Sequence, residues 1–136
     1  MAEFSITSTT NKTTSSLKDL YNFLNDFKNF ASILPEDKVE DFKYSENECS
    51  FSIKGITPMT IKVVERKPFE SILFSSEGLA KFNFSLKVQF IGEADTTGEC
   101  KIDLFGDLNP FIKAMAEKPL GNLVNSMSLK LSQLTV

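Results

Sequence analysis

The chain has 136 residues and a formal net charge of −3, and 41% of its residues are hydrophobic. This length predicts a single domain, residues 1–136, and this apolar fraction predicts a globular core rather than a disordered chain. Scattered basic residues argue against a nucleic acid partner, and no apolar run approaches the roughly 20 residues of a membrane span. The N-terminal residues lack the apolar stretch of a signal peptide, so we expect a cytoplasmic protein without stable membrane insertion.

The sequence offers little for metal or cofactor chemistry. It contains no histidine, which is the commonest general base and metal ligand. Cys49 and Cys100 fall on the apolar side of alternating segments, so we expect two buried free thiols. Two lone cysteines do not form a metal ligand set, and no Gly-rich segment has the spacing of a phosphate-binding loop. We therefore expect no metal site and no cofactor.

The N-terminal part of the chain predicts a strand followed by two short helices. Residues 3–10 alternate in polarity, which is typical of a strand with one buried face. Ser16 and Asp26 are residue types that cap helices, and each precedes apolar residues at helical spacing. The first predicted helix runs from residue 16 to about residue 25, and the second covers residues 27–34 before Pro35 stops it.

Between residues 37 and 105 the polarity alternates with a period of two, which predicts six further strands. Their expected ranges are 37–44, 47–54, 59–66, 70–77, 81–91 and 99–105. Because the connections are short, neighbouring strands are expected to be antiparallel, with one buried and one exposed face.

The last segment, Asn109–Val136, carries the one long helical pattern of the sequence. Asn109 suits the N-cap and Pro110 the first helical position, whereas Pro119 and Gly121 predict a kink or a break. After the break an apolar stripe is expected to pack permanently on the sheet: Leu120, Leu123, Val124, Met127, Leu131 and Leu134. Before it, Phe111, Ile112 and Met115 form a different face, so we expect this first half to border a cavity mouth and to move.

The element order and several short motifs resemble the START/SRPBCC superfamily, and in particular small bacterial START-like proteins. The motifs are Phe23-Leu24 with Phe27, Asn29 and Phe30; residues 34–39 (LPEDKV); Cys49-Ser50-Phe51 with Ile53 and Gly55; residues 107–111 (DLNPF); and Lys118-Pro119-Leu120. The resemblance implies an α+β helix-grip fold, in which a curved antiparallel sheet of about seven strands holds a long kinked C-terminal helix. It also implies a hydrophobic cavity between sheet and helix, without a shared set of catalytic residues.

The main functional hypothesis is binding of a lipid-like or polyketide-like small molecule in that cavity. Residues on the inward faces are the candidate ligand contacts: Tyr44, Phe51, Ile53, Ile61, Phe74, Ser76, Phe84, Leu86, Leu104, Phe111, Met115, Leu123 and Met127. Glu40, Tyr44 or Ser76 is expected to orient a polar end of the ligand. The alternative for these apolar side chains is that they simply fill the core.

Two other functions stay open at this stage. A cyclase or dehydratase in the same cavity needs an inward carboxylate with a shifted pKa, and alternation makes Glu40 and then Glu65 the candidates. A protein-interaction module would instead have a filled core and an exposed apolar patch, with Phe105 and Leu108 as places to look. We expect a monomer or a weak homodimer.

Overall fold

The computed structural model describes residues 2–53, 58–77, 83–108 and 110–136. Its elements follow the predicted order, with two additions, the short strand β2 and the 3₁₀ turn η1. The helical elements are α1 (Leu17–Leu24), α2 (Phe27–Phe30), η1 (Ala31–Ile33) and α3 (Pro110–Gln133). The strands are β1 (Ala2–Thr7), β2 (Asn11–Lys12), β3 (Val39–Tyr44), β4 (Glu48–Ile53), β5 (Pro58–Lys67), β6 (Ser71–Glu77), β7 (Asn83–Ile91) and β8 (Glu99–Leu108).

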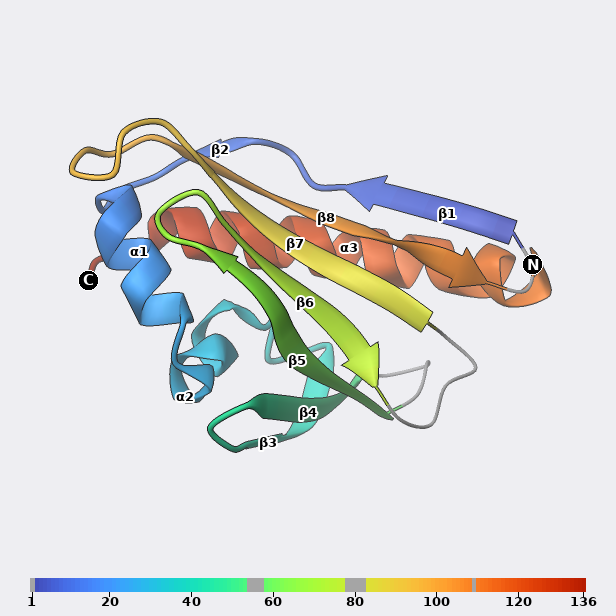
Figure 1. Ribbon diagram of the computed structural model, residues 1–136. Coiled ribbons are helices and arrows are strands. Elements are labelled where there is room, and N and C mark those ends of the chain that lie inside the picture. The colour runs from blue at the N-terminus through green and yellow to red at the C-terminus, as the bar shows by residue number, and fades with distance from the viewer. Residues whose placement is uncertain (1, 54–57, 78–82, 109) are drawn as a thin grey trace.

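One antiparallel sheet contains all the strands of the described residues. Its order is β1-β8-β7-β6-β5-β4-β3, with β2 also paired to β8, so β1 and β3 form the two edges. Figure 1 shows α3 crossing behind the sheet, while α1 and α2 lie at one end of it. This curved sheet around a long C-terminal helix is a helix-grip α+β fold, as the resemblance implied.

Local sequence signals account for the two short helices. The Ser16 hydroxyl accepts a hydrogen bond from the Asp19 amide at 3.2 Å, which caps α1. The Asp26 carboxylate accepts one from the Lys28 amide at 3.0 Å, which caps α2. Both predicted caps are therefore confirmed, although the α-helical part of the second helix ends at Phe30.

Rings and aliphatic side chains fill the space between α1, α2 and the sheet. Phe74 of β6 is 1% exposed, and its ring centroid lies 5.9 Å from that of Phe27 and 5.4 Å from that of Phe30. Tyr21 of α1 makes an edge contact with Phe90 of β7 at 6.1 Å. These contacts bury one face of each short helix against the sheet and form the centre of the core.

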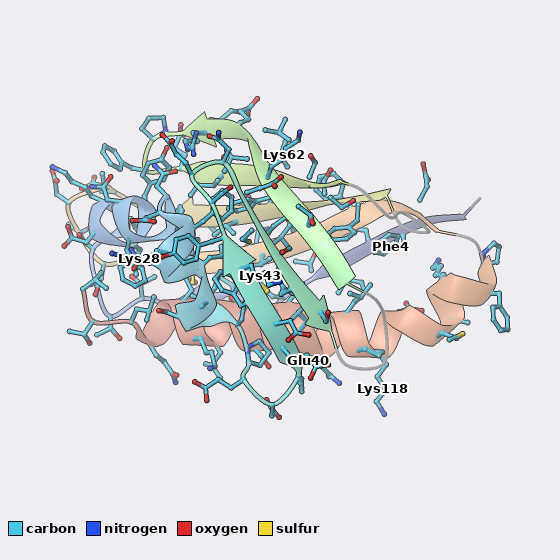
Figure 2. The ribbon with its side chains drawn as sticks, turned by 90° about the horizontal axis from the view of Figure 1, so that it is seen from below. Phe4, Lys28, Glu40, Lys43, Lys62 and Lys118 are labelled. Carbon is cyan, nitrogen blue, oxygen red and sulfur yellow. The ribbon has the colours of Figure 1, made fainter. Side chains whose placement is uncertain are left out.

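The two halves of α3 differ as their sequences predict. In the second half the predicted stripe is buried, and its last member, Leu134, lies one residue beyond the helix and is partly buried. In the first half Phe111 and Met115 are exposed by 72% and 60%. The helix continues through Pro119, although proline has no backbone N–H to donate to a helical hydrogen bond. Figure 2 shows that the direction of α3 changes near Lys118. Asn109, the expected N-cap, lies outside the described residues.

Hydrogen bonds fasten the second half of α3 to the N-terminal segment. The Ser15 hydroxyl donates to the Leu134 carbonyl at 2.7 Å and accepts from the Val136 amide at 3.0 Å. The Thr14 amide donates to the Ser132 carbonyl at 2.9 Å. The C-terminal end of the helix is thus fixed by groups more than one hundred residues earlier in the chain.

Candidate functional site

A cavity of about 610 Å³ lies where the first half of α3 meets the β1–β8 edge of the sheet. Its lining comes from β1, β8 and α3: Phe4, Ser5, Phe105, Gly106, Asp107, Lys113 and Glu117. This volume falls within the range of roughly 300–1,000 Å³ that is typical of small-molecule sites. The cavity is open to solvent, so it is a candidate entry site rather than an enclosed void.

The register of three neighbouring strands explains why there is room here. Gly106 of β8 lies directly opposite Phe4 of β1 and Phe84 of β7. Directly opposed residues of antiparallel strands share a face, so a residue without a side chain stands between two large rings. The gap that results at Gly106 is the part of the cavity that the sheet provides.

The helix supplies charged groups along the cavity. Lys113 and Glu117 are four residues apart on α3, which places them on the same side of the helix. Asp107 lies near the end of β8, and Ser5 lies on β1. Phe4 and Phe105 add aromatic surface, so the cavity combines an apolar part with a charged rim. Such a lining suits an amphipathic molecule better than a purely apolar one.

A second, smaller pocket of about 160 Å³ lies on the β3–β4–β5 part of the sheet. Tyr44, Ser45, Glu48 and Thr60 are among its lining residues. Cys49 also borders it, and burial raises the pKa of this thiol to about 12, with the charge of Glu48 adding to the effect. A thiol that keeps its proton is a poor nucleophile, so this pocket lacks a reactive group at Cys49.

Most of the ligand contacts expected from the sequence are buried residues of the hydrophobic core. Eight of them are buried in the main core: Phe51, Ile61, Phe74, Phe84, Leu86, Leu104, Leu123 and Met127. Ser76 is half-buried, and its hydroxyl accepts a hydrogen bond from the Phe84 amide at 3.0 Å. Tyr44, Phe111 and Met115 are exposed, and the side chain of Ile53 lies outside the described residues. The described lining of the 610 Å³ cavity includes none of these expected contacts.

A β-bulge changes the position expected for Glu40. The register of β3 with β4 shifts between Glu40 and Lys43, and Asp41 within this stretch has a φ of 57°. Glu40 pairs with Ser52, whereas Tyr44 pairs with the buried Cys49. Glu40 and Tyr44 therefore lie on opposite faces of the sheet, and the expectation that they share a face is wrong because a bulge inserts an extra residue.

A second bulge has the same effect on Glu65. The register of β5 with β6 shifts between Val63, which pairs with the buried Phe74, and Glu65, which pairs with Leu73. Glu65 is thereby placed on the outer face and is 55% exposed, with Lys67 Nζ 3.7 Å from its carboxylate. Both carboxylates proposed for catalysis thus point away from the core, which removes the feature on which the enzyme hypothesis rested.

The cavity residues were missed for an identifiable reason. Alternation predicted the last strand to end at Phe105, but β8 continues through Gly106 to Leu108. A glycine inside a strand often marks a bulge or a close approach, and here it marks the gap between two rings. This signal is present in the sequence, whereas nothing in the sequence places Lys113 and Glu117 opposite Phe4.

Comparisons with known proteins support the fold. No family model matches the sequence, and no curated protein matches it. Among solved structures, this chain is similar to a norcoclaurine synthase mutant from Thalictrum flavum in complex with a transition-state analogue. The TM-score is 0.70 and the identity 8%, and the match covers 96% of this chain and 94% of that chain. A protein from Thermus thermophilus also has a TM-score of 0.70, with 12% identity and coverage of 95% of this chain and 94% of that chain.

An uncharacterised protein from Bacillus thuringiensis is similar as well, with a TM-score of 0.62, 12% identity, and coverage of 96% of this chain and 98% of that chain. Structural similarity at identities this low establishes the helix-grip fold alone. The fold is one that neighbouring structures use both for enzymes and for proteins without an assigned function, so function has to be argued from the site.

The described residues contain neither a cluster of metal-ligating side chains nor a helix that could span a membrane. No group of three or more Cys, Asp or Glu side chains in this part of the chain is arranged to hold a metal ion. Of the helices described, none is long and apolar enough to cross a membrane.

Proposed function

We propose that the protein binds a small amphipathic molecule, lipid-like or polyketide-like, in the cavity between the β1–β8 edge and the first half of α3. The observation that carries the proposal is the gap at Gly106, flanked in register by Phe4 and Phe84 and opening onto a cavity of about 610 Å³. The helix-grip fold supports it, because this fold holds a helix over a concave sheet face.

The ligand orientation follows from the lining. The apolar part of the molecule lies against Phe4, with Phe84 behind Gly106, and Phe105 borders the cavity from the other face of β8. Its polar end lies at the rim, within reach of Lys113, Glu117 and Asp107. Burial of apolar surface provides the affinity, at roughly 25 cal/mol per Å², and the charged rim provides the orientation.

The helix half that carries Lys113 and Glu117 is the proposed moving part. Phe111 and Met115 of this half are exposed, whereas beyond Pro119 the helix is buried along one side and fastened at its end. An element with few buried apolar groups opens at low free-energy cost. Movement about the kink at Pro119 would widen or narrow the cavity mouth without disturbing the core.

The test uses a neutral fluorescent probe, N-phenyl-1-naphthylamine, together with native mass spectrometry of the purified protein. We expect saturable probe binding to the wild type, weakened at least about tenfold by Gly106→Val, because the new side chain fills the gap. Ser85→Val is the matched control, since Ser85 lies on the neighbouring strand opposite Phe105 and does not line the cavity.

Circular dichroism establishes that both variants keep the fold. Equal probe affinity for wild type and Gly106→Val would contradict the proposal, as would probe binding that does not saturate. A compound that co-purifies with the wild type and is lost from Gly106→Val would give the chemical class of the natural ligand.

A further inference from the structure

The two edges of the sheet differ in how far they are protected against strand addition. β3 carries a bulge, a residue at positive φ (Asp41) and two further charged residues, Glu40 and Lys43, all of which obstruct pairing with another strand. β1 pairs with β8 in unbroken register from Ala2 to Thr7, contains no proline, and has Glu3 as its one charged residue. Figure 1 shows β1 along the border of the sheet with no labelled element beyond it.

The hydrogen-bond pattern shows which groups of β1 point outward. The Ser8 amide donates to the Ile102 carbonyl of β8 at 2.9 Å. Along a strand, the amides of every second residue point the same way, so the backbone of Phe4 and Ile6 also faces β8. The amide and carbonyl groups of Glu3, Ser5 and Thr7 therefore point away from β8, to the open side.

The open edge has a defined end. Thr9 would be the next outward-facing residue, but its amide donates to the Asn125 side chain of α3 at 2.9 Å. The free edge therefore consists of Glu3, Ser5 and Thr7, with Ser5 at its centre. When an antiparallel strand pairs with a copy of itself, the central residue with outward backbone groups lies opposite its own copy, and the flanking residues pair with each other.

We propose that β1 pairs with β1 of a second copy of this chain across a two-fold axis at Ser5. In this register Ser5 lies opposite the second copy's Ser5, and Glu3 lies opposite the second copy's Thr7. The pairing joins all the outward backbone groups of the three residues and keeps the two Glu3 residues apart. It also sets Phe4 opposite the second copy's Ile6, so the apolar faces of the two sheets become continuous.

The dimer completes the cavity. Phe4 and Ser5 line the 610 Å³ cavity on its β1 side. The second copy's Ile6 comes beside Phe4, so each copy adds an apolar residue to the cavity border of the other. Pairing along six residues buries far less than the roughly 1,200 Å² of a standard stable interface, so the association is weak, with a Kd of roughly micromolar to millimolar.

Cysteine cross-linking tests the register on the ligand-free protein, so its outcome is independent of ligand binding. In the proposed dimer the Cα atoms of the two Ser5 residues are about 5.5 Å apart, within the range of a disulfide. Those of the two Thr7 residues are roughly 14 Å apart. With oxidised glutathione, Ser5→Cys is expected to form a dimer and Thr7→Cys is not. Cys49 and Cys100 are buried and do not compete.

Sedimentation equilibrium up to roughly 1 mM tests the association itself. We expect the wild type to shift from 15.2 kDa towards twice that mass. Ser5→Pro, which removes the central outward amide, and Ser5→Lys, which sets two charges at the axis, are each expected to raise the Kd at least about tenfold.

Ser85→Lys is the matched control, because it adds the same charge on the same face but on an interior strand, and it is expected to leave the Kd unchanged. A wild type that stays at 15.2 kDa throughout, or Thr7→Cys cross-linking as fast as Ser5→Cys, overturns the proposal.

Discussion

Phe74 tests whether the inward aromatic residues fill the core or contact a ligand. Its side chain is 1% exposed and touches the rings of Phe27 and Phe30 across the sheet–helix boundary. Replacing it by alanine removes a buried ring and leaves a void that rigid neighbours fill only in part. For such a change the expected loss in the free energy of unfolding is about 3–5 kcal/mol.

A loss of this size is a large share of the roughly 5–15 kcal/mol that stabilises a domain, and it lowers Tm by about 10–20 °C for a chain of this length. Urea and thermal denaturation followed by circular dichroism measure it. Phe105→Ala is the control, because Phe105 is 38% exposed and is expected to cost about 1 kcal/mol or less. If Phe74→Ala lowers the free energy of unfolding by less than about 1 kcal/mol, the reasoning is refuted and Phe74 is again a candidate ligand contact.

Gly98→Ala is expected to cost about 1–3 kcal/mol, because its Cβ would collide with the Ile91 carbonyl oxygen. Gly121→Ala on α3, whose Cβ would make an ordinary van der Waals contact with the Ile6 side chain at 3.9 Å, is expected to be neutral or stabilising by up to about 1 kcal/mol; chemical denaturation of both variants checks this. Burial raises the thiol pKa of Cys49 to about 12 and of Cys100 to about 11, from 9.0, so the folded state holds these protons more tightly than the unfolded chain does. The contribution of these two thiols to the free energy of unfolding is therefore expected to be fully present below pH 9.0 and to be lost between pH 9.0 and about 12. Thiol-reagent labelling at about pH 8 should require unfolding, and rapid labelling of the native protein would contradict the assignment.

The element order could be predicted from the sequence because its signals are local. Ser16 and Asp26 specify helix starts within a few residues, and alternation marks each strand without reference to its neighbours. The buried stripe of α3 beyond Pro119 follows from helical spacing alone. These features depend on the residue types within one turn or one strand, so a single sequence contains them.

The site could not be predicted in the same way. A bulge adds one residue to a strand without changing its composition, so the stretch around Val64 reads as a regular strand until the pairing of Glu65 with Leu73 is seen. The cavity depends on Phe4, Gly106 and Lys113 meeting from three elements that are far apart in the sequence. Register and long-range packing decide both outcomes, and Gly106 within β8 is the one local sign of the cavity that the sequence contains.

The fastening of the N-terminal segment to the end of α3 has a consequence for the chain as it leaves the ribosome. β1 has no partner until β8 is made, and the Ser15 hydroxyl meets Leu134 and Val136 only when the last residues appear. The meander from β3 to β7 is therefore complete while its apolar face still lacks α3. During this interval the apolar sheet face that α3 later covers stays exposed, and the nascent chain depends on late-arriving residues or on chaperones to cover it.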